Sequence, residues 1–290
     1  MSKSKLSFRI GADPELLLRK GSAPIPAFGL FGGTKDEPLP FNKKDKGYAY
    51  LEDNAALEFN VPSTDSITQF PAIIRRAMRN IETLLTDRQL SYTTDHMIEL
   101  SSTYLKDERA HVLGCLPDKD AYMNNLEGGQ RVPFNGTMLG NKRYCGGHIH
   151  LQYDHEKVPR NVAALFLDLY LGLPCARLDK QRPTGRRDIY GRPGLYREKP
   201  YGIEYRTLSN FWVFRTDTYL TYMAAACQSF AVDVRDNMDA LVDAYKVLPW
   251  ERIHDAIVSE DIDTAQTLIR QAAESSRLHL QNSLELACVA

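Results

Sequence analysis

The chain has 290 residues, of which 43% are hydrophobic and 25% charged, a balance typical of globular proteins with a sizeable core. Its formal net charge of −1 gives no electrostatic reason to expect nucleic acid or an anionic membrane as a partner. We expect no signal peptide and no membrane span, because no apolar run approaches the roughly 18–20 residues that a span requires. The five cysteines are widely spaced and never in a Cys-x-x-Cys pair, so we expect reduced thiols and a cytoplasmic location.

Partial alternation of apolar and polar residues predicts six strands. In chain order they are Leu6–Ile10, Glu15–Arg19, Ala55–Val61, His96–Ser101, His148–Tyr153 and Gly202–Leu208. A helical repeat of apolar residues predicts two helices among them. The first spans Thr64–Leu85, with Ser63 or Thr64 as its cap, and the second spans Asn161–Leu171 and is stopped by Gly172 and Pro174.

From about Thr218 the chain is expected to be wholly helical, in two or three pieces broken near Pro249 and Ser259. Strands mixed with helices early and helices alone later favour the α+β class over a regular βαβ repeat. We expect one domain over residues 1–290, with a sheet-bearing part at 1–215 and a helical part at 216–290. Segments 24–48 and 178–201 are rich in Gly, Pro and charge, and such long loops are usually functional or disordered.

Paired polar residues occur on several of the predicted strands. Gly146-Gly147-His148-Ile149-His150 places two imidazoles on one strand face, which suits a metal or a phosphate. An ordinary strand with two hydrogen-bonded histidines is the competing interpretation. Asp13-Pro14-Glu15 likewise places two carboxylates on one face, as oxygen ligands for Mg²⁺ or Mn²⁺, although Asp-Pro pairs also start turns.

Two later strands carry charged residues. Glu58 lies in an otherwise apolar strand, where it is either paired, metal-bound or on a solvated face. Glu204 and Arg206 share a face, as a structural ion pair or as a metal ligand beside a phosphate clamp.

Residues 177–206 contain seven arginines among glycines and prolines, which indicates an anionic partner, and a polyphosphate fits better than nucleic acid. A solvated charged loop is the alternative. The arginines are Arg177, Arg182, Arg186, Arg187, Arg192, Arg197 and Arg206.

In this order the motifs resemble the glutamine synthetase / glutamate–cysteine ligase superfamily, and most closely its compact phage-encoded carboxylate–amine ligases (amidoligases). The matching residues span about two-thirds of the chain. They are Gly-Ala-Asp13-Pro-Glu15, Gly32-Gly-Thr-Lys35, Asp53-Asn54-(x)3-Glu58-Phe-Asn60, Gly147-His148-Ile-His150 and Glu204-Tyr-Arg206-Thr-Leu-Ser-Asn210. The resemblance implies a glutamine-synthetase-like curved antiparallel β-sheet backed by helices, whose concave face holds nucleotide, metals and substrate.

The resemblance also implies roles for individual residues. Metal ligands would be Asp13, Glu15, Glu58, His148 and Glu204, with Asp53 a further candidate. The nucleotide would be held by Lys35, Arg192, Arg197 and His148. Catalysis would involve Arg206, Arg186, Arg187, Glu58 and His150. One departure is Asp13, since glutamine synthetase has a glutamate there and the shorter acid reaches less far.

The implied reaction needs ATP and Mg²⁺, with Mn²⁺ as an alternative. A carboxylate is phosphorylated to an acyl phosphate, and an amine then displaces phosphate to leave an amide or peptide bond. The expected partners are a small-molecule or peptide carboxylate and an amine, and a modified nucleobase is also compatible with the motifs. No membrane partner is expected. A homo-oligomer is compatible with the sequence. The competing functions are a metal-dependent hydrolase that uses the same His and acid cluster, and a nucleotide-binding protein without turnover.

Overall fold

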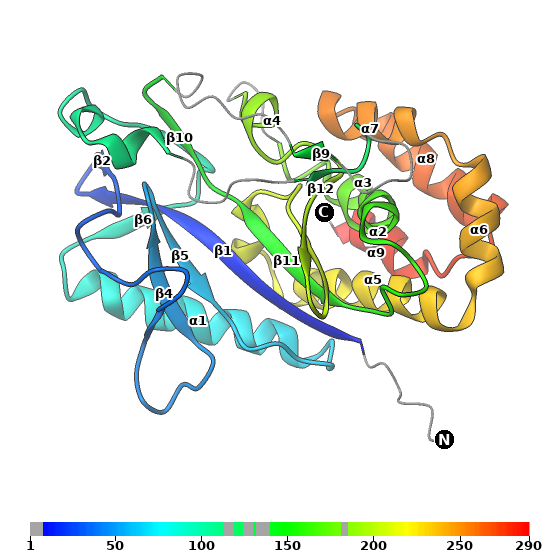
Figure 1. Cartoon of the computed structure of the whole chain (residues 1–290), viewed down its shortest axis with the longest axis horizontal. Coiled ribbons are helices and arrows are strands. Elements are labelled where there is room, and N and C mark those ends of the chain that lie inside the picture. The colour runs from blue at the N-terminus through cyan, green and yellow to red at the C-terminus, as the bar shows by residue number, and fades with distance from the viewer. Residues whose placement is uncertain (1–7, 113–118, 124–129, 132–139, 181–184, 290) are drawn as a thin grey trace.

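The computed structural model describes residues 8–112, 119–123, 130–131, 140–180 and 185–289. These residues form a mixed structure with one large antiparallel sheet and a helical C-terminal part (Figure 1). The main path of the sheet has the strand order β3-β4-β5-β1-β11-β13-β12-β8-β9, and β2 and β6 also pair with β1. The α+β class is therefore confirmed. Among the described helices, none is both long enough and apolar enough to cross a membrane.

The strands of the large sheet are β1 (Arg9–Lys20), β2 (Ala23–Ile25), β3 (Leu39–Pro40), β4 (Ala49–Asp53), β5 (Ala56–Asn60), β6 (Ser91–Thr93), β8 (Lys119–Asp120), β9 (Gln130–Arg131), β11 (Gly147–Gln152), β12 (Leu195–Lys199) and β13 (Gly202–Tyr205). A separate two-stranded sheet pairs β7 (Met97–Glu99) with β10 (Lys142–Tyr144). Four of the predicted strands correspond, within a few residues at each end, to β5, β7, β11 and β13.

The other two predicted strands are one continuous strand, β1, and residues 1–7 lie outside the described residues. The expected interruption between them, at residues 11–14, is wrong. Pro14 cannot donate a ladder hydrogen bond, but it lies where the partner of β1 changes. Arg9–Pro14 pair with β11, whereas the next two residues pair with β5.

The α-helices are α1 (Gln69–Thr86), α2 (Arg160–Leu167), α3 (Leu173–Cys175), α4 (Arg186–Ile189), α5 (Asp217–Asp236), α6 (Met238–Val247), α7 (Trp250–Ser259), α8 (Ile262–Ser275) and α9 (Gln281–Val289). A π-helical turn, η4 (Asp168–Gly172), joins α2 to α3. Short 3₁₀ turns are η1 (Tyr104–Lys106), η2 (Glu108–His111) and η5 (Asn210–Phe214). The region after the last strand is thus helical as predicted, but five described helices replace the two or three expected.

Two predicted helix ends are wrong for identifiable reasons. Thr64 does not cap α1, because its backbone pairs with Ile10 in an isolated β-bridge and the helix begins five residues later. Gly172 does not end its helix, which continues through the π turn to Cys175. A side chain at Gly172 would collide with the Tyr205 hydroxyl and Ile257, so this glycine allows close packing instead.

One face of the sheet forms the core with the helices. Leu16, Leu57, Ile149, Leu151 and Ile203 are fully buried and belong to one apolar cluster with residues of α1, α2 and α5. They alternate along their strands with polar residues, which therefore lie on the opposite face. We call that opposite side the polar face.

Candidate functional site

The polar face gathers the residues that the strand motifs predicted. On β1 it carries Asp13 and Glu15, and the register places them opposite His148 of β11 and Glu58 of β5. His150 in turn lies opposite Glu204 of β13. Because directly opposed residues of antiparallel strands share a face, four separate sequence motifs meet in one place.

The first acid group consists of Asp13, His150 and Glu204, whose ligand atoms lie within 4.8 Å of one another. Asp13 Oδ2 lies 2.9 Å from His150 Nε2, and Asp13 Oδ1 lies 3.3 Å from His148 Nδ1. Burial raises the pKa of Asp13, but the attraction of His150 and His148 outweighs it and holds that pKa well below its usual value. Burial lowers the pKa of His150, but Asp13 more than compensates, so the pKa is raised.

The second acid group consists of Glu15, Asp53 and Glu58, all buried and also within 4.8 Å of one another. Burial, followed by repulsion from Asp13, Asp53 and Glu15, raises the pKa of Glu58 well above its usual value. Lys35 lies at the edge of this group, with its Nζ 3.5 Å from Asp53 Oδ2. A bound cation would relieve the repulsion among these carboxylates.

Three cations surround Glu204. Lys199 Nζ lies 2.8 Å from its Oε2, Arg197 lies 3.3 Å from its Oε1, and Arg206 is paired with it as well. Burial raises the pKa of Glu204, but Arg206 and the two histidines outweigh burial and lower it far below the usual range. Arg197 and Lys199 keep about a quarter of their side-chain surface exposed, so they can also reach a bound anion.

The seven arginines do not act as one group in the structure. Arg186 is fully buried, and its guanidinium donates to the carbonyls of Cys145, Thr207 and Leu208. Arg187 is buried as well and donates to the Gly191 carbonyl and to Asp179. These two arginines thus hold loops around the site.

The remaining arginines are spread out. Arg192 lies 3.6 Å from Asp120 and Arg177 is exposed beyond α3, while Arg182 lies outside the described residues. Arg206 and Arg197 are the two that the structure places beside the acid groups.

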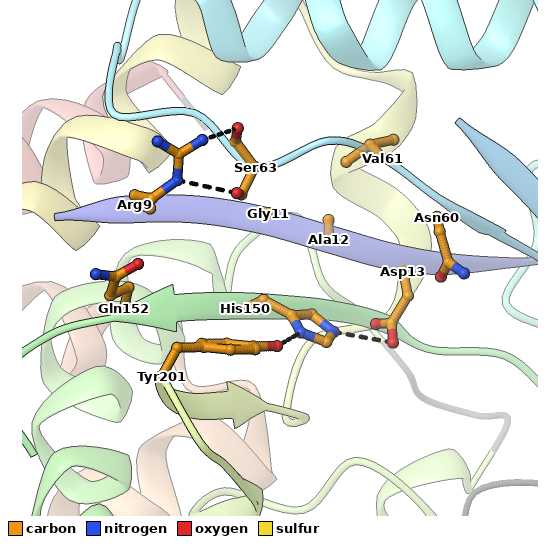
Figure 2. Close-up of a pocket in the computed structure, with 10 residues that line it drawn as sticks. All are labelled: Arg9, Gly11, Ala12, Asp13, Asn60, Val61, Ser63, His150, Gln152 and Tyr201. Carbon is orange, nitrogen blue, oxygen red and sulfur yellow. Dashed lines mark hydrogen bonds and ion pairs between the residues drawn. The ribbon is translucent and has the colours of Figure 1, made fainter. Parts of the chain in front are cut away.

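A cavity of about 310 Å³ opens next to the first acid group. Figure 2 shows its lining residues on the paired strands β1 and β11, in the segment 60–63 and at Tyr201, with His150 between Asp13 and the hydroxyl of Tyr201. Arg9 closes one end, where it donates to the side chain and carbonyl of Ser63. The other lining residues are Gly11, Ala12, Asn60, Val61 and Gln152.

The loop that carries Lys35 is held by a carboxylate. Glu52 of β4 accepts hydrogen bonds from the backbone N–H groups of Gly29, Phe31 and Gly32, at 2.8, 2.6 and 2.8 Å. Burial raises the pKa of Glu52, but these N–H donors outweigh it and lower it. The Gly-Gly-Thr-Lys motif is therefore anchored to the strand that ends in Asp53.

The motifs alone did not identify Tyr190, Tyr201 or Lys199 as site residues. Tyr190 ends α4 and is buried, with its hydroxyl between Glu15, His148 and Arg206. The only signal for Tyr190 was its position in the unassigned 178–201 segment. The sequence does place Lys199 two residues after Arg197, so that both side chains lie on one face of β12. This strand pairs with β13, where Arg197 lies opposite Glu204.

Comparison with known proteins gives one family. Residues 130–238 match the sequence model described as "Phage phiEco32-like COOH.NH2 ligase-type 2". The matched region contains both histidines of β11, Tyr190, Glu204 and Arg206, whereas β1, β4 and β5 lie before it. No curated protein matches the chain significantly. The family match confirms the resemblance to phage-type carboxylate–amine ligases.

Proposed function

From the match of residues 130–238 to the family model of phage-type carboxylate–amine ligases, we propose that this chain is an ATP- and Mg²⁺-dependent enzyme that forms an amide or peptide bond through an acyl phosphate. We further propose that its sheet is the curved sheet of the glutamine-synthetase-like fold. The observation that carries the proposal is the pair of acid groups on one polar face, bordered by Arg197, Lys199 and Arg206. Mn²⁺ is the expected substitute for Mg²⁺.

The donor sets fit divalent cations that prefer oxygen ligands. Asp13 Oδ1 is a buried oxygen without a hydrogen-bond partner among the described residues, although it points to the first acid group. In the second group three buried carboxylates are crowded together, and the pKa of Glu58 is raised. We propose that Asp13, Glu204 and a β11 histidine hold one ion, and that Glu15, Asp53 and Glu58 hold a second.

The cavity beside the first acid group is the proposed site for the base and ribose of ATP. It lies along β1 next to Asp13, so a nucleotide bound there can extend its phosphates towards His150 and Glu204. Arg197 and Lys199 lie where they can contact these phosphates. Lys35 lies at the far end of the face, beside the second acid group, where it can bind an anionic substrate.

In the proposed reaction an oxygen of the substrate carboxylate attacks the γ-phosphorus of ATP, and the bond from that phosphorus to the ADP oxygen breaks. Arg206, which is already aligned by Glu204 and Tyr190, stabilises the charge that spreads over the transferred phosphoryl group. Ions in the two acid groups would draw charge from the same phosphates.

In the second step the amine attacks the acyl carbon and inorganic phosphate leaves. The incoming amine must lose a proton, and Glu58, a carboxylate of the second acid group, is the proposed acceptor. No covalent bond to the enzyme is required. The reaction therefore needs no activated Ser or Cys, and the Cys145 thiol, whose pKa is raised by burial, is an unsuitable nucleophile.

The test is ADP release by the full chain in the presence of ATP and Mg²⁺, screened over pairs of carboxylates and amines. We expect ADP only when both substrates are present, with one amide formed for each ADP. The variants Glu204→Gln and Glu58→Gln should abolish turnover while keeping the fold by circular dichroism. Bond cleavage without nucleotide would favour the hydrolase, and ATP binding without any turnover would favour the non-catalytic alternative.

A further inference from the structure

Tyr190 lies at the junction of the two acid groups. Its hydroxyl is 3.2 Å from Glu15 Oε1 and 3.0 Å from Arg206 Nη2, and 2.5 Å from His148 Nε2. The ring is buried and lies against the guanidinium groups of Arg186 and Arg206. One side chain thus contacts three strands, β1, β11 and the end of β13.

The hydrogen-bonding capacity of a phenol decides the direction of these contacts. A tyrosine hydroxyl donates one proton and accepts at two lone pairs. Glu15 as a carboxylate can only accept, and the Arg206 guanidinium can only donate. The hydroxyl proton therefore goes to Glu15, and the hydroxyl oxygen accepts from Arg206 and from His148 Nε2.

This pattern determines which nitrogen of His148 can bind a metal. Nε2 carries a proton whether the imidazole is neutral or charged, so only Nδ1 can offer a lone pair. Nδ1 lies 3.3 Å from Asp13 Oδ1 and 3.8 Å from Glu204 Oε1. Asp13 Oδ1 is the buried oxygen that has no hydrogen-bond partner among the described residues.

His150 has a different environment. Its Nε2 is in ion-pair contact with Asp13 and its Nδ1 is bonded to Tyr201, so protein groups contact both ring nitrogens. Both ring nitrogens of His148 have contacts as well, because its Nδ1 lies 3.3 Å from Arg206 Nη1. A guanidinium can only donate, so this contact also requires that Nδ1 carries the lone pair, and a cation held by Nδ1 would take the place of the Arg206 contact.

The backbone is shaped around the His148–Tyr190 pair. A Cβ at Gly146 would overlap His148 Nε2 and would lie 2.8 Å from the Tyr190 hydroxyl. The Gly146 N–H also donates to Glu15 Oε2 at 2.6 Å. The glycine before β11 thus leaves room for the two side chains and orients the same carboxylate that Tyr190 contacts.

We propose that Tyr190 is a positioning residue that keeps His148 protonated at Nε2, so that Nδ1 joins Asp13 and Glu204 as the ligand of a divalent cation. The inference rests on the proposed function in so far as it assumes a metal at the first acid group. The same hydroxyl also orients Glu15, a proposed metal ligand of the second acid group, and Arg206, the arginine proposed to bind the transferred phosphoryl group.

The experiment compares the full wild-type chain with Tyr190→Phe, which keeps the ring and removes the hydroxyl. Tyr170→Phe is the matched control, because its buried hydroxyl donates to Asp233 of α5, which belongs to neither acid group. Mn²⁺ binding is measured by calorimetry without nucleotide, and thermal unfolding reports the cost of losing a buried hydroxyl. The imidazole ¹⁵N shifts of His148, assigned with His148→Gln, report which nitrogen is protonated.

We expect Tyr190→Phe to weaken Mn²⁺ binding about 10–100-fold, as loss of a hydrogen bond to a metal-binding histidine does. Tyr170→Phe should leave Mn²⁺ binding unchanged, and wild-type His148 should be protonated at Nε2. Unchanged Mn²⁺ affinity in Tyr190→Phe overturns the inference and leaves the ligase proposal intact.

Two further results separate the proposals. Absence of Mn²⁺ and Mg²⁺ binding by the wild-type chain would contradict the metal-dependent function itself. If Tyr190→Phe does not fold, the wild-type spectrum still decides, because an unprotonated Nε2 on His148 overturns the inference.

Discussion

Glu58 of β5 lies directly opposite Glu15 of β1, so two buried carboxylates face each other across one pair of antiparallel strands. Like charges in this position destabilise a sheet unless a proton or a cation intervenes. The repulsion is concentrated at Glu58, whose pKa is raised by burial and by three neighbouring acids. The metal-free fold is therefore strained at the position where the proposed second ion binds.

The first prediction concerns this strain. Glu58→Gln removes one negative charge, so the metal-free variant should unfold at a higher temperature than the wild-type chain at pH 7–8. Millimolar Mg²⁺ should raise the unfolding temperature of the wild-type chain and have a smaller effect on the variant. Differential scanning calorimetry in EDTA and in Mg²⁺ measures both. Equal Mg²⁺ stabilisation of the two proteins would show that Glu58 is not a ligand.

The second prediction concerns pH and Asp168, which lies in the π turn behind β13 and accepts from the Tyr205 hydroxyl at 2.5 Å. Burial raises its pKa to about 7. Because this folded-state pKa lies above that of an unfolded aspartate, the stabilisation is complete at low pH and is lost as the pH rises through 7. Between pH 5 and 8 the wild-type chain should lose roughly 2–3 kcal/mol from this residue.

Asp168→Asn removes this titration while keeping an acceptor for Tyr205. Its stability should change less between pH 5 and 8 than that of the wild-type chain, as measured by urea unfolding at each pH. Parallel curves for the two proteins would show that Asp168 keeps the same protonation state throughout this range.

The third prediction concerns the cavity at Gly11. A Cβ at this position would lie 3.4 Å from Ser63 Cβ, which is ordinary contact, so Gly11→Ala should fold normally. Gly11→Val places more atoms in the cavity, where they would overlap a bound nucleotide. An overpacking cost of about 1–3 kcal/mol in the complex predicts that ATP binding is weakened roughly tenfold or more. Calorimetry with ATP and Mg²⁺ tests this, with Mn²⁺ binding alone as the control. ATP affinity unaffected by valine would place the base elsewhere.

The fourth prediction separates the loop arginines by role. Arg186→Ala leaves three buried carbonyls without their charged donor, so it should destabilise the fold by roughly 3 kcal/mol or more. Arg197→Ala should change stability by less than about 1 kcal/mol, because the side chain is partly exposed. It should nevertheless weaken ATP binding about tenfold. The reverse pattern, in denaturation and calorimetry, would restore Arg186 as the phosphate ligand.

The side-chain period of β-strands made much of the site predictable. Asp13 with Glu15, His148 with His150, and Glu204 with Arg206 share a face because each pair is two residues apart. The order of strands in the sheet was not predictable from these pairs, since it depends on pairing between segments far apart in the sequence. Only the register shows that Glu58 faces Glu15.

The loops limited the prediction most. Arginines of similar sequence surroundings differ in what they bind, because a fold can use a guanidinium to hold its own carbonyls as well as a ligand. Arg186 and Arg197 illustrate the two cases. Tyr190 escaped notice because its role depends on Glu15, 175 residues away in the sequence, and no local pattern records such a contact.

Along the central part of strand β1, residues that pack in the hydrophobic core alternate with residues that line the candidate site. Ile10 and Leu16 face the helices, and Arg9, Gly11, Asp13 and Glu15 line the cavity and acid groups. Inserting or deleting one residue there would exchange the two faces, burying carboxylates in the core and exposing leucine in the site. Ligand specificity at this face can therefore change by substitution within β1 or by lengthening of the loops that follow it, whereas a change in the length of β1 would disrupt the site and the fold at once.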